Sequence, residues 1–297
     1  MHKLPGYILF LIPLSGIHAQ NSVPSLVAKN AEIQKAGSGY SFTEGSSVAR
    51  DGRVFFTDQP NDRIYIWDEK EGISLFKEGC ERSNGTWFGQ DGNLLACADL
   101  NNRLVKFTPS GDMSVLHEKG YQGRHLNGPN DLWQDKQGGI YFTDPYYRRD
   151  YWKAEHKQEQ DIQAVYYLRT TGELIRVVDD LKQPNGIVGT PDGKYLFVAD
   201  IQGSVTWKYT IHPDGSLGNK TRFAPAGSDG MTVDSQGNVY LTFGKVLIFS
   251  PAGEKIGEIE LPEHPSNICF GGKSRKMLFI TAGTSVFTLR MRVRGVE

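Results

Sequence analysis

The stretch QPNGIVGTPDGKYLFVAD, residues 183–200, contains a pattern that recurs along the whole chain. An amide residue, Asn185, is followed by a short apolar run, a glycine-containing turn and the strand-like segment LFVAD, which ends at Asp200. Equivalent segments end at Asp58, Asp99, Asp144, Gly244 and Gly283, so that the six endings are separated by 41, 45, 56, 44 and 39 residues. Self-similarity at a period of this length is typical of repeat proteins.

Each repeat contains further strand-like segments after a polar gap. A third segment follows in every repeat, for example RIYIWD or SVTWKYTIHPDG, and a fourth in several, for example SLFKEG or ELIRVVDD. Four strands in a unit of about 40–45 residues are typical of a β-propeller blade. The sequence therefore predicts an all-β, six-bladed β-propeller spanning residues 37–290. Residues 31–40 have no blade of their own, and we expect them to supply the outer strand of the last blade.

The two ends of the chain lie outside this repeat. Residues 1–19 contain Lys3 and an apolar run, residues 7–14, which is too short to span a bilayer as a helix. This segment resembles a secretory signal peptide and predicts export to the periplasm or the cell exterior; an uncleaved hydrophobic arm is the alternative. After cleavage we expect no stable membrane insertion. Residues 20–36 form an N-terminal segment, and residues 291–297 are expected to form a C-terminal tail.

Composition excludes some classes of partner and chemistry. The 297 residues carry a formal net charge of −1, which gives no indication of a nucleic-acid partner. The three cysteines, Cys80, Cys97 and Cys269, have no zinc-ligand spacing, and no nucleophile motif of a serine or cysteine hydrolase is present. In an exported protein Cys80 and Cys97 could pair, although the count does not require it. The oligomeric state is not indicated.

One position of the repeat is polar in every unit. It lies seven residues before the glycine turn and is occupied by Glu44, Asn84, Asn130, Asn185, Asp229 and Asn267. This position begins the innermost strand of each predicted blade, and innermost strands line the central channel. Six side chains that are distant in sequence should therefore converge on one axis.

The chemistry of this ring favours a hard cation. Two carboxylates and four amides offer only oxygen ligands, which suit Ca²⁺ first, with Mg²⁺, Mn²⁺ or Zn²⁺ as further options. Two carboxylates would neutralise a divalent ion, whereas unpaired buried carboxylates are unfavourable. A water-filled structural channel is the alternative that spacing alone leaves open.

The chain also resembles the gluconolactonase/regucalcin-like family of six-bladed propellers. The matching segments occur in the family's order and are FTEG at Glu44, LNGPND at Asn130, QPNGI at Asn185, SDGMTVDSQGNVYLT at Asp229 and SNICFGG. Two departures concern Gly45-Ser46, where many members have Gly-Pro, and Gly128, where the regucalcin branch has Arg. The sugar contacts of that branch are therefore not transferred to this chain.

The resemblance implies a divalent-metal-dependent lactone hydrolase with a sugar lactone as substrate. It places the metal ligands at Glu44, Asn130, Asn185 and Asp229. In the implied reaction the metal polarises the lactone carbonyl, and Asp229 assists the attack of water as the base. A role for Asp229 as a ligand alone stays open. A broader, paraoxonase-like lactonase or esterase and a non-catalytic calcium- or ligand-binding propeller are the alternative functions.

Further residues are candidates for substrate contact. The longest interval places the segment PYYRRDYWKAEHKQEQDIQ, residues 145–163, over the channel as a lid. Its aromatic residues, above all Tyr146 and Trp152 and also Tyr147 and Tyr151, could stack on a sugar ring, and Arg148 or Arg149 could meet a carboxylate product. Asn84, Asn127 and Asn130 could bind substrate hydroxyls. A solvated surface loop and a turn-forming role for Asn127 are the respective alternatives.

Overall fold

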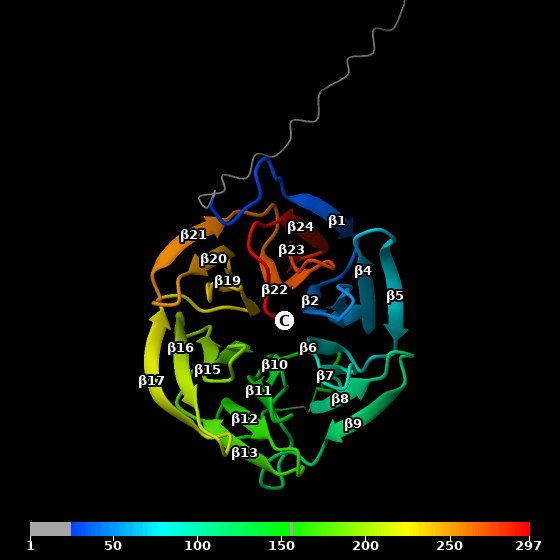
Figure 1. Ribbon diagram of the computed structural model, residues 1–297. Coiled ribbons are helices and arrows are strands. Elements are labelled where there is room, and N and C mark those ends of the chain that lie inside the picture. The colour runs from blue at the N-terminus through cyan, green and yellow to red at the C-terminus, as the bar shows by residue number, and fades with distance from the viewer. Residues whose placement is uncertain (1–24, 155–156) are drawn as a thin grey trace, which may run out of the picture.

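The structure is a computed structural model that describes residues 25–154 and 157–297. Six four-stranded antiparallel sheets stand radially around a central channel (Figure 1). The predicted six-bladed β-propeller is therefore confirmed. Within the described ranges the sole helical element is the short 3₁₀ helix η1 (Gln59–Asn61), and no helix there is long and apolar enough to cross a bilayer. The signal peptide predicted for residues 1–19 lies outside the described residues.

Five blades consist of consecutive strands, the innermost strand first. The first blade contains β2 (Thr43–Val48), β3 (Val54–Asp58), β4 (Arg63–Asp68) and β5 (Gly72–Glu78). The second contains β6 (Ser83–Phe88), β7 (Leu94–Ala98), β8 (Arg103–Phe107) and β9 (Met113–His117). The third contains β10 (Leu132–Gln134), β11 (Ile140–Asp144), β12 (Ala164–Leu168) and β13 (Leu174–Val178). The fourth contains β14 (Pro184–Gly189), β15 (Tyr195–Asp200), β16 (Val205–Ile211) and β17 (Leu217–Ala224). The fifth contains β18 (Met231–Val233), β19 (Val239–Phe243), β20 (Lys245–Phe249) and β21 (Lys255–Ile259).

The sixth blade joins the two ends of the chain. It contains β22 (Pro265–Gly271), β23 (Met277–Ala282), β24 (Ser285–Arg290) and, as its outer strand, β1 (Gln34–Ser38). β1 pairs antiparallel with β24, with Gln34 opposite Thr288 and Ser38 opposite Ser285. The outer strand predicted within residues 31–40 is thus present, and its ladder closes the ring between the first and last blades.

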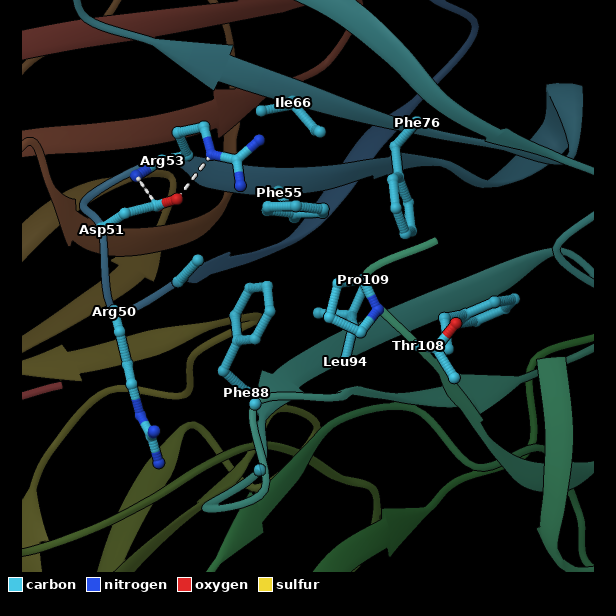
Figure 2. Close-up of a pocket in the computed structure, with 14 residues that line it drawn as sticks. Arg50, Asp51, Arg53, Phe55, Ile66, Phe76, Phe88, Leu94, Thr108 and Pro109 are labelled. Carbon is cyan, nitrogen blue, oxygen red and sulfur yellow. Dashed lines mark hydrogen bonds and ion pairs between the residues drawn. The ribbon is translucent and has the colours of Figure 1, made fainter. Parts of the chain in front are cut away.

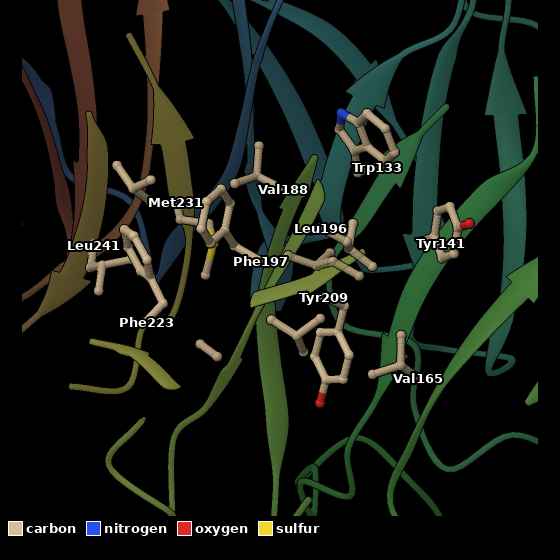
Figure 3. Close-up of a cluster of buried hydrophobic side chains, with 14 of the residues drawn as sticks. Trp133, Tyr141, Val165, Val188, Leu196, Phe197, Tyr209, Phe223, Met231 and Leu241 are labelled. Atoms are coloured by element: carbon tan, nitrogen blue, oxygen red, sulfur yellow. The ribbon is translucent and has the colours of Figure 1, made fainter. Parts of the chain in front are cut away.

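The hydrophobic core lies between neighbouring blades. In each blade the second strand is covered on both faces, and β3, β7 and β11 are buried along their whole length. Strands buried on both faces read as continuous apolar runs, which explains the repeated VFFTD-like pattern. Figure 3 shows one of these interfaces, in which Tyr141 of blade three, Phe197 of blade four and Leu241 of blade five belong to a single buried cluster.

Three features differ from the sequence-based expectations. The outer strand of the fourth blade, β17, has the polar sequence LGNKTRFA and was not predicted, because an outer strand exposes one face and needs no apolar run. All three cysteines are buried free thiols, so the disulfide considered between Cys80 and Cys97 is not formed. Residues 291–297 turn inward instead of trailing away, and Gly295 forms a β-bridge with Asp234, so that the chain ends near the channel axis (Figure 1).

Candidate metal centre and substrate cavity

The predicted ring of polar residues assembles at one end of the channel. Glu44, Asn84, Asn185 and Asn267 lie on the innermost strands β2, β6, β14 and β22, and Asn130 and Asp229 lie just before β10 and β18. Five of the six are buried, whereas Asp229 is partly exposed. The structure therefore brings together side chains that the repeat spacing had placed on one axis.

Five ring residues line a cavity of about 200 Å³. Its complete lining is Phe42, Glu44, Asn84, Asn130, Tyr147, Arg149, Asn185, Ile201 and Asp229. Asn267 is not part of this wall. Its side-chain amide donates a hydrogen bond of 2.9 Å to Oε2 of Glu44, and its Oδ1 accepts one of 2.7 Å from the backbone N–H of Ile268. Asn267 thus supports Glu44 from behind.

Glycines after the ring residues allow the innermost strands to approach one another. A Cβ on Gly45 would lie 1.9 Å from the carbonyl oxygen of Asn84, and a Cβ on Gly85 would lie 2.4 Å from that of Asn130. The Gly85 N–H instead donates to the Asn130 carbonyl at 2.8 Å. Gly45 also has a φ of 54°, in the left-handed region that favours glycine. The EG and NG pairs of the sequence therefore reflect backbone contact between successive blades.

The aspartates that end the second strands make the same type of contact in several blades. Asp58 Oδ1 accepts hydrogen bonds of 3.1 Å from the backbone N–H groups of Ser41 and Phe42. Asp144 accepts from Asn127 and Gly128, and Asp200 from Lys182 and Gln183, through backbone N–H groups at 2.8–3.0 Å. These carboxylates hold the loops that deliver Glu44, Asn130 and Asn185 to the channel.

The electrostatics of the cavity favour an added positive charge. Burial, and then the negative charge of Asp229, raise the pKa of Glu44 well above its usual value. Burial raises the pKa of Asp229 to about 6, and a hydrogen bond from Asn185 and the charge of Arg149 oppose this rise. Two buried carboxylates, one of which raises the proton affinity of the other, are suited to share a cation.

Two amide oxygens point to the same conclusion. Oδ1 of Asn84 and Oδ1 of Asn185 are buried and lack a hydrogen-bond partner. A buried acceptor without a partner is uncommon in folded proteins and is explained by a bound ion or water. In the described ranges no three or more His, Cys, Asp or Glu side chains lie so that they could hold a metal ion by themselves, and the polar set here combines two carboxylates with amides. This donor set fits a hard divalent cation such as Ca²⁺.

From the segment between β11 and β12, the cavity wall receives Tyr147 and Arg149 and not the aromatic residues favoured from sequence. Tyr147 is on the cavity wall, and its hydroxyl accepts a hydrogen bond of 2.8 Å from Nδ2 of Asn185. Trp152 is buried, and its indole N–H donates to the carbonyl of Asp99 at 3.0 Å. Tyr146 packs near Trp152 at 6.0 Å between ring centroids and does not line the cavity. Tyr147, and not Tyr146 or Trp152, is therefore the aromatic residue that this segment contributes to the cavity wall.

Asn127 also lies away from the cavity wall. Its side chain is buried, and Nδ2 donates to the carbonyls of Asp144 and Ile162 at 3.2 and 2.9 Å. These long-range bonds tie Asn127 to the segment between β11 and β12, and its Oδ1 has no hydrogen-bond partner among the described residues, so the Asx-type turn considered for Asn127 is not formed either. Sequence reasoning also missed Phe42 and Ile201 as cavity residues. Phe42 lies two residues before Glu44 and Ile201 directly after Asp200, and only knowledge of the loop packing identifies them.

A second cavity, of about 270 Å³, opens between the first and second blades (Figure 2). Its walls include Phe55, Phe76 and Phe88, and its one carboxylate, Asp51, accepts a 2.8 Å hydrogen bond from Nε of Arg53. The lining loops include the glycine turns at the channel end opposite the polar ring. This cavity has the character of an inter-blade packing gap, and the polar ring remains the candidate site.

Comparison with known proteins gives the same family from the whole sequence. The chain is 29% identical over 293 residues to a gluconolactonase of Zymomonas mobilis, covering 89% of this chain and 82% of that enzyme. It is 27% identical over 231 residues to a diisopropyl-fluorophosphatase of Loligo vulgaris, covering 72% and 70%. The structure matches the gluconolactonase XC5397 of Xanthomonas campestris with a TM-score of 0.83 at 26% identity, covering 89% and 91%. Residues 42–284 match the family described as the SMP-30/Gluconolactonase/LRE-like region, and the chain belongs to this family.

Proposed function

We propose that this protein is an exported, divalent-cation-dependent hydrolase of a sugar lactone. The observation that carries the proposal is the convergence of Glu44 and Asp229 on one cavity with the unpartnered amide oxygens of Asn84 and Asn185. Family membership and the gluconolactonase relatives support a lactone as the substrate class.

Glu44, Asn130, Asn185 and Asp229 are the residues that would hold the cation, and Asn84 offers a further oxygen. Ca²⁺ is the first choice because all the donors are oxygens. The amides contribute no charge, so the two carboxylates balance the charge of one divalent ion. When bound, the cation would supply Lewis-acid polarisation of the lactone carbonyl and neutralise the two carboxylates. Asn267 would keep Glu44 oriented through its 2.9 Å hydrogen bond.

Asp229 is the proposed base for the attacking water. It is partly exposed to the cavity, whereas Glu44 is buried and already accepts hydrogen bonds from Asn267 and from the backbone of Gly45. Asp229 therefore has the more direct access to a water in the cavity. Burial raises the pKa of Asp229 to about 6, which makes it a stronger base than an exposed aspartate. The proton then passes to the alkoxide oxygen that leaves when the ring ester bond breaks.

The other wall residues define the space for the substrate. Asn84 and Asn130 are proposed to bind ring hydroxyls, and Phe42 and Ile201 offer apolar surface to the sugar ring. A cavity of about 200 Å³ accommodates a single sugar-sized ring and not a long acyl chain.

A broader esterase is the second candidate. The match to a diisopropyl-fluorophosphatase favours it, because that relative is named for a substrate other than a lactone. A non-catalytic cation-binding propeller is the third. The three candidates differ in which compounds the protein hydrolyses, so one substrate screen can distinguish them.

The decisive experiment is a pH-stat assay of the purified protein after removal of bound metal by a chelator. Sugar lactones, aliphatic lactones and aryl esters are each tested with Ca²⁺, Mg²⁺, Mn²⁺ and Zn²⁺. We expect metal-dependent hydrolysis of sugar lactones in preference to aryl esters. Equal turnover of aryl esters would favour the broader esterase, and no turnover with any pair would favour the non-catalytic propeller. Full activity in the presence of excess chelator would contradict the metal requirement.

Export is a separate part of the proposal and rests on the sequence of residues 1–19. Expression of the full chain in a bacterial host, followed by fractionation and N-terminal sequencing, tests it. A mature protein that begins near residue 20 in an exported fraction would support export, whereas an intact Met1 in the cytoplasmic fraction would contradict it.

A further inference from the structure

The segment between β11 and β12 contributes a cation to the cavity. Arg149 is part of the cavity wall, together with Tyr147 from the same segment and the ring residues Glu44 and Asp229. Arg149 and Asp229 thus face the same cavity of about 200 Å³. The neighbouring Arg148 does not line the cavity, and its Nη2 donates to the carbonyl of Lys153 at 2.9 Å. The structure thus distinguishes between two arginines that were equivalent in sequence.

Arg149 is held in place by a buried carboxylate. Its Nε donates to Oδ2 of Asp99 at 2.6 Å, and the side chain of Asp99 is only 2% exposed. The same oxygen accepts a hydrogen bond of 2.8 Å from Nε2 of Gln59, which is also buried, and another from the hydroxyl of Tyr151. Asp99 ends the LLACAD segment, at the repeat position where Asp58, Asp144 and Asp200 hold the channel loops. In the second blade, the aspartate that ends the second strand therefore binds Arg149.

The guanidinium group of Arg149 also contacts the aromatic ring of Tyr147 on the cavity wall. Cζ of Arg149 lies 5.4 Å from the ring centroid of Tyr147, and the hydroxyl of Tyr147 accepts a hydrogen bond from Asn185. A chain of contacts thus runs from Asp99 through Arg149 and Tyr147 to a proposed cation ligand. A guanidinium group fixed by Nε on one side and a ring on the other is pre-oriented, so little side-chain freedom is lost when it binds a ligand.

The terminal nitrogens of Arg149 remain for a ligand. The hydrogen bond of Arg149 to Asp99 uses Nε, and among the residues that the structure describes no carboxylate or carbonyl accepts a hydrogen bond from Nη1 or Nη2. Two parallel N–H groups of a guanidinium match the two oxygens of a carboxylate. A lactone is neutral, but its hydrolysis produces a carboxylate. A cation beside the reacting group therefore complements the charge that the reaction creates.

We propose that Arg149 binds the carboxylate that forms when the lactone opens, and that Asp99 is the positioning residue for Arg149. This inference rests on the proposed function for the identity of the ligand. In the reaction the carbonyl carbon gains the oxygen of water, its bond to the ring oxygen breaks, the ring oxygen takes one proton of that water, and the second proton is released to solvent, which leaves the carboxylate. Arg149 transfers no proton, because a guanidinium stays protonated, and acts by charge and by two hydrogen bonds.

The test measures the binding of a product anion to the cation-loaded full chain. Calorimetric titrations use D-gluconate as the carboxylate probe and gluconamide as its neutral counterpart, at a constant concentration of free Ca²⁺. The variants are Arg149→Gln, Arg149→Lys and the matched control Arg148→Gln. We expect Arg149→Gln to weaken gluconate binding at least tenfold and to change gluconamide binding less than twofold. Arg148→Gln should match the wild type for both probes, and Arg149→Lys, which keeps the charge but loses the fork, should lie in between.

The role of Asp99 is tested by a double-mutant cycle. Asp99→Asn should weaken gluconate binding in the wild-type background, and it should have no further effect in the Arg149→Gln background, because its action passes through Arg149. Equal effects in both backgrounds would contradict the positioning role. Ca²⁺ affinity and thermal unfolding are measured for every variant, and Arg149→Lys serves as the folded comparison should Arg149→Gln fail to fold.

The outcomes separate this inference from the proposed function. If Arg149→Gln binds gluconate as the wild type does, or loses gluconamide equally, the carboxylate site is refuted even where lactones are hydrolysed. If the wild-type protein with bound Ca²⁺ does not bind gluconate, the inference also fails. If gluconate binding depends on Arg149 but no lactone is hydrolysed, the anion site stands and the proposed function fails.

Discussion

Nδ2 of Asn267 donates a hydrogen bond of 2.9 Å to Oε2 of Glu44 across a sequence separation of 223 residues. Glu44 belongs to β2 of the first blade and Asn267 to β22 of the last, so the bond spans the junction at which the ring closes. The two carboxylates of the cavity are therefore held differently. Each has an amide donor from a neighbouring blade, Asn267 for Glu44 and Asn185 for Asp229, but Glu44 is buried whereas Asp229 is partly exposed to the cavity.

This difference predicts unequal effects of two charge-neutral substitutions. Glu44→Gln removes a ligand charge and keeps an oxygen, so Ca²⁺ affinity should fall and lactone hydrolysis should recover substantially at saturating Ca²⁺. Asp229→Asn makes the same change but also removes the proposed base, and general-base catalysis contributes about 10²–10⁴-fold. We expect kcat of Asp229→Asn to stay lower by about that factor at full Ca²⁺ occupancy. Occupancy is measured by calorimetry for both variants. Equal recovery of the two would show that Asp229 is only a ligand.

A second prediction concerns the hydroxyl of Tyr147. Tyr147→Phe removes one acceptor for Nδ2 of Asn185, so the amide, whose Oδ1 is buried without a partner, is less firmly oriented. Loss of a partner that orients a metal ligand lowers metal affinity by about 10–100-fold. Tyr146→Phe is the matched control, because Tyr146 does not line the cavity. Ca²⁺ titration of both variants checks this, and an equal affinity for the two would rule out an orienting role of Tyr147.

A third prediction concerns the close packing of the innermost strands. Gly45→Ala and Gly72→Ala both place alanine at a positive φ, 54° and 77°, but only the Cβ at position 45 meets another atom, at 1.9 Å. Inserting a methyl group into close-packed surroundings costs about 1–3 kcal/mol. Gly45→Ala should therefore lower the free energy of unfolding by about that much more than Gly72→Ala does. Urea denaturation measures the difference, and similar losses would mean that the innermost strands move apart easily.

A fourth prediction concerns the pH dependence of stability. Burial raises the pKa of Asp144 to about 7, although backbone N–H groups of Asn127 and Gly128 oppose the rise. An aspartate in an unfolded chain has a pKa of about 3.9, so between about pH 4 and pH 7 the unfolded state releases this proton and the folded state retains it. The contribution of Asp144 to stability is therefore complete below about pH 4 and decreases as the pH rises through 7.

The corresponding experiment compares wild type and Asp144→Asn in chelator between pH 4 and pH 8. The variant lacks the titrating group and does not lose this contribution as the pH rises. The difference in the free energy of unfolding, variant minus wild type, should therefore increase from pH 4 to pH 8. A constant difference between the two proteins over this range would mean that folded Asp144 is already ionised at pH 4.

Much of the fold could be predicted because it is repetitive. The second strand of each blade is buried on both faces, and this gives the VFFTD-like apolar runs their regular spacing. The outer strand β17 was missed because an outer strand is covered on one face only and carries a polar sequence. Local pattern thus predicts an element more readily where burial constrains its residues.

The positions of the ring residues were also determined by the sequence itself. A polar residue at one place in each of six repeats must reach one axis once the repeats form a closed ring, whatever the details of packing. The cavity accordingly contains Glu44, Asn84, Asn130, Asn185 and Asp229. Which ring residue faces the cavity and which supports it was not determined, because that depends on the side-chain contact between Asn267 and Glu44.

Tertiary structure alone decided the residues that the irregular segments bring to the site. Tyr146, Tyr147 and Trp152 are equivalent aromatic residues in the sequence, yet Tyr147 lines the cavity while Trp152 is buried against Asp99. The same holds for Arg148 and Arg149, of which only Arg149 reaches the cavity. A loop has no period that relates its residues to the channel axis, so its side-chain directions follow from long-range contacts such as that between Arg149 and Asp99.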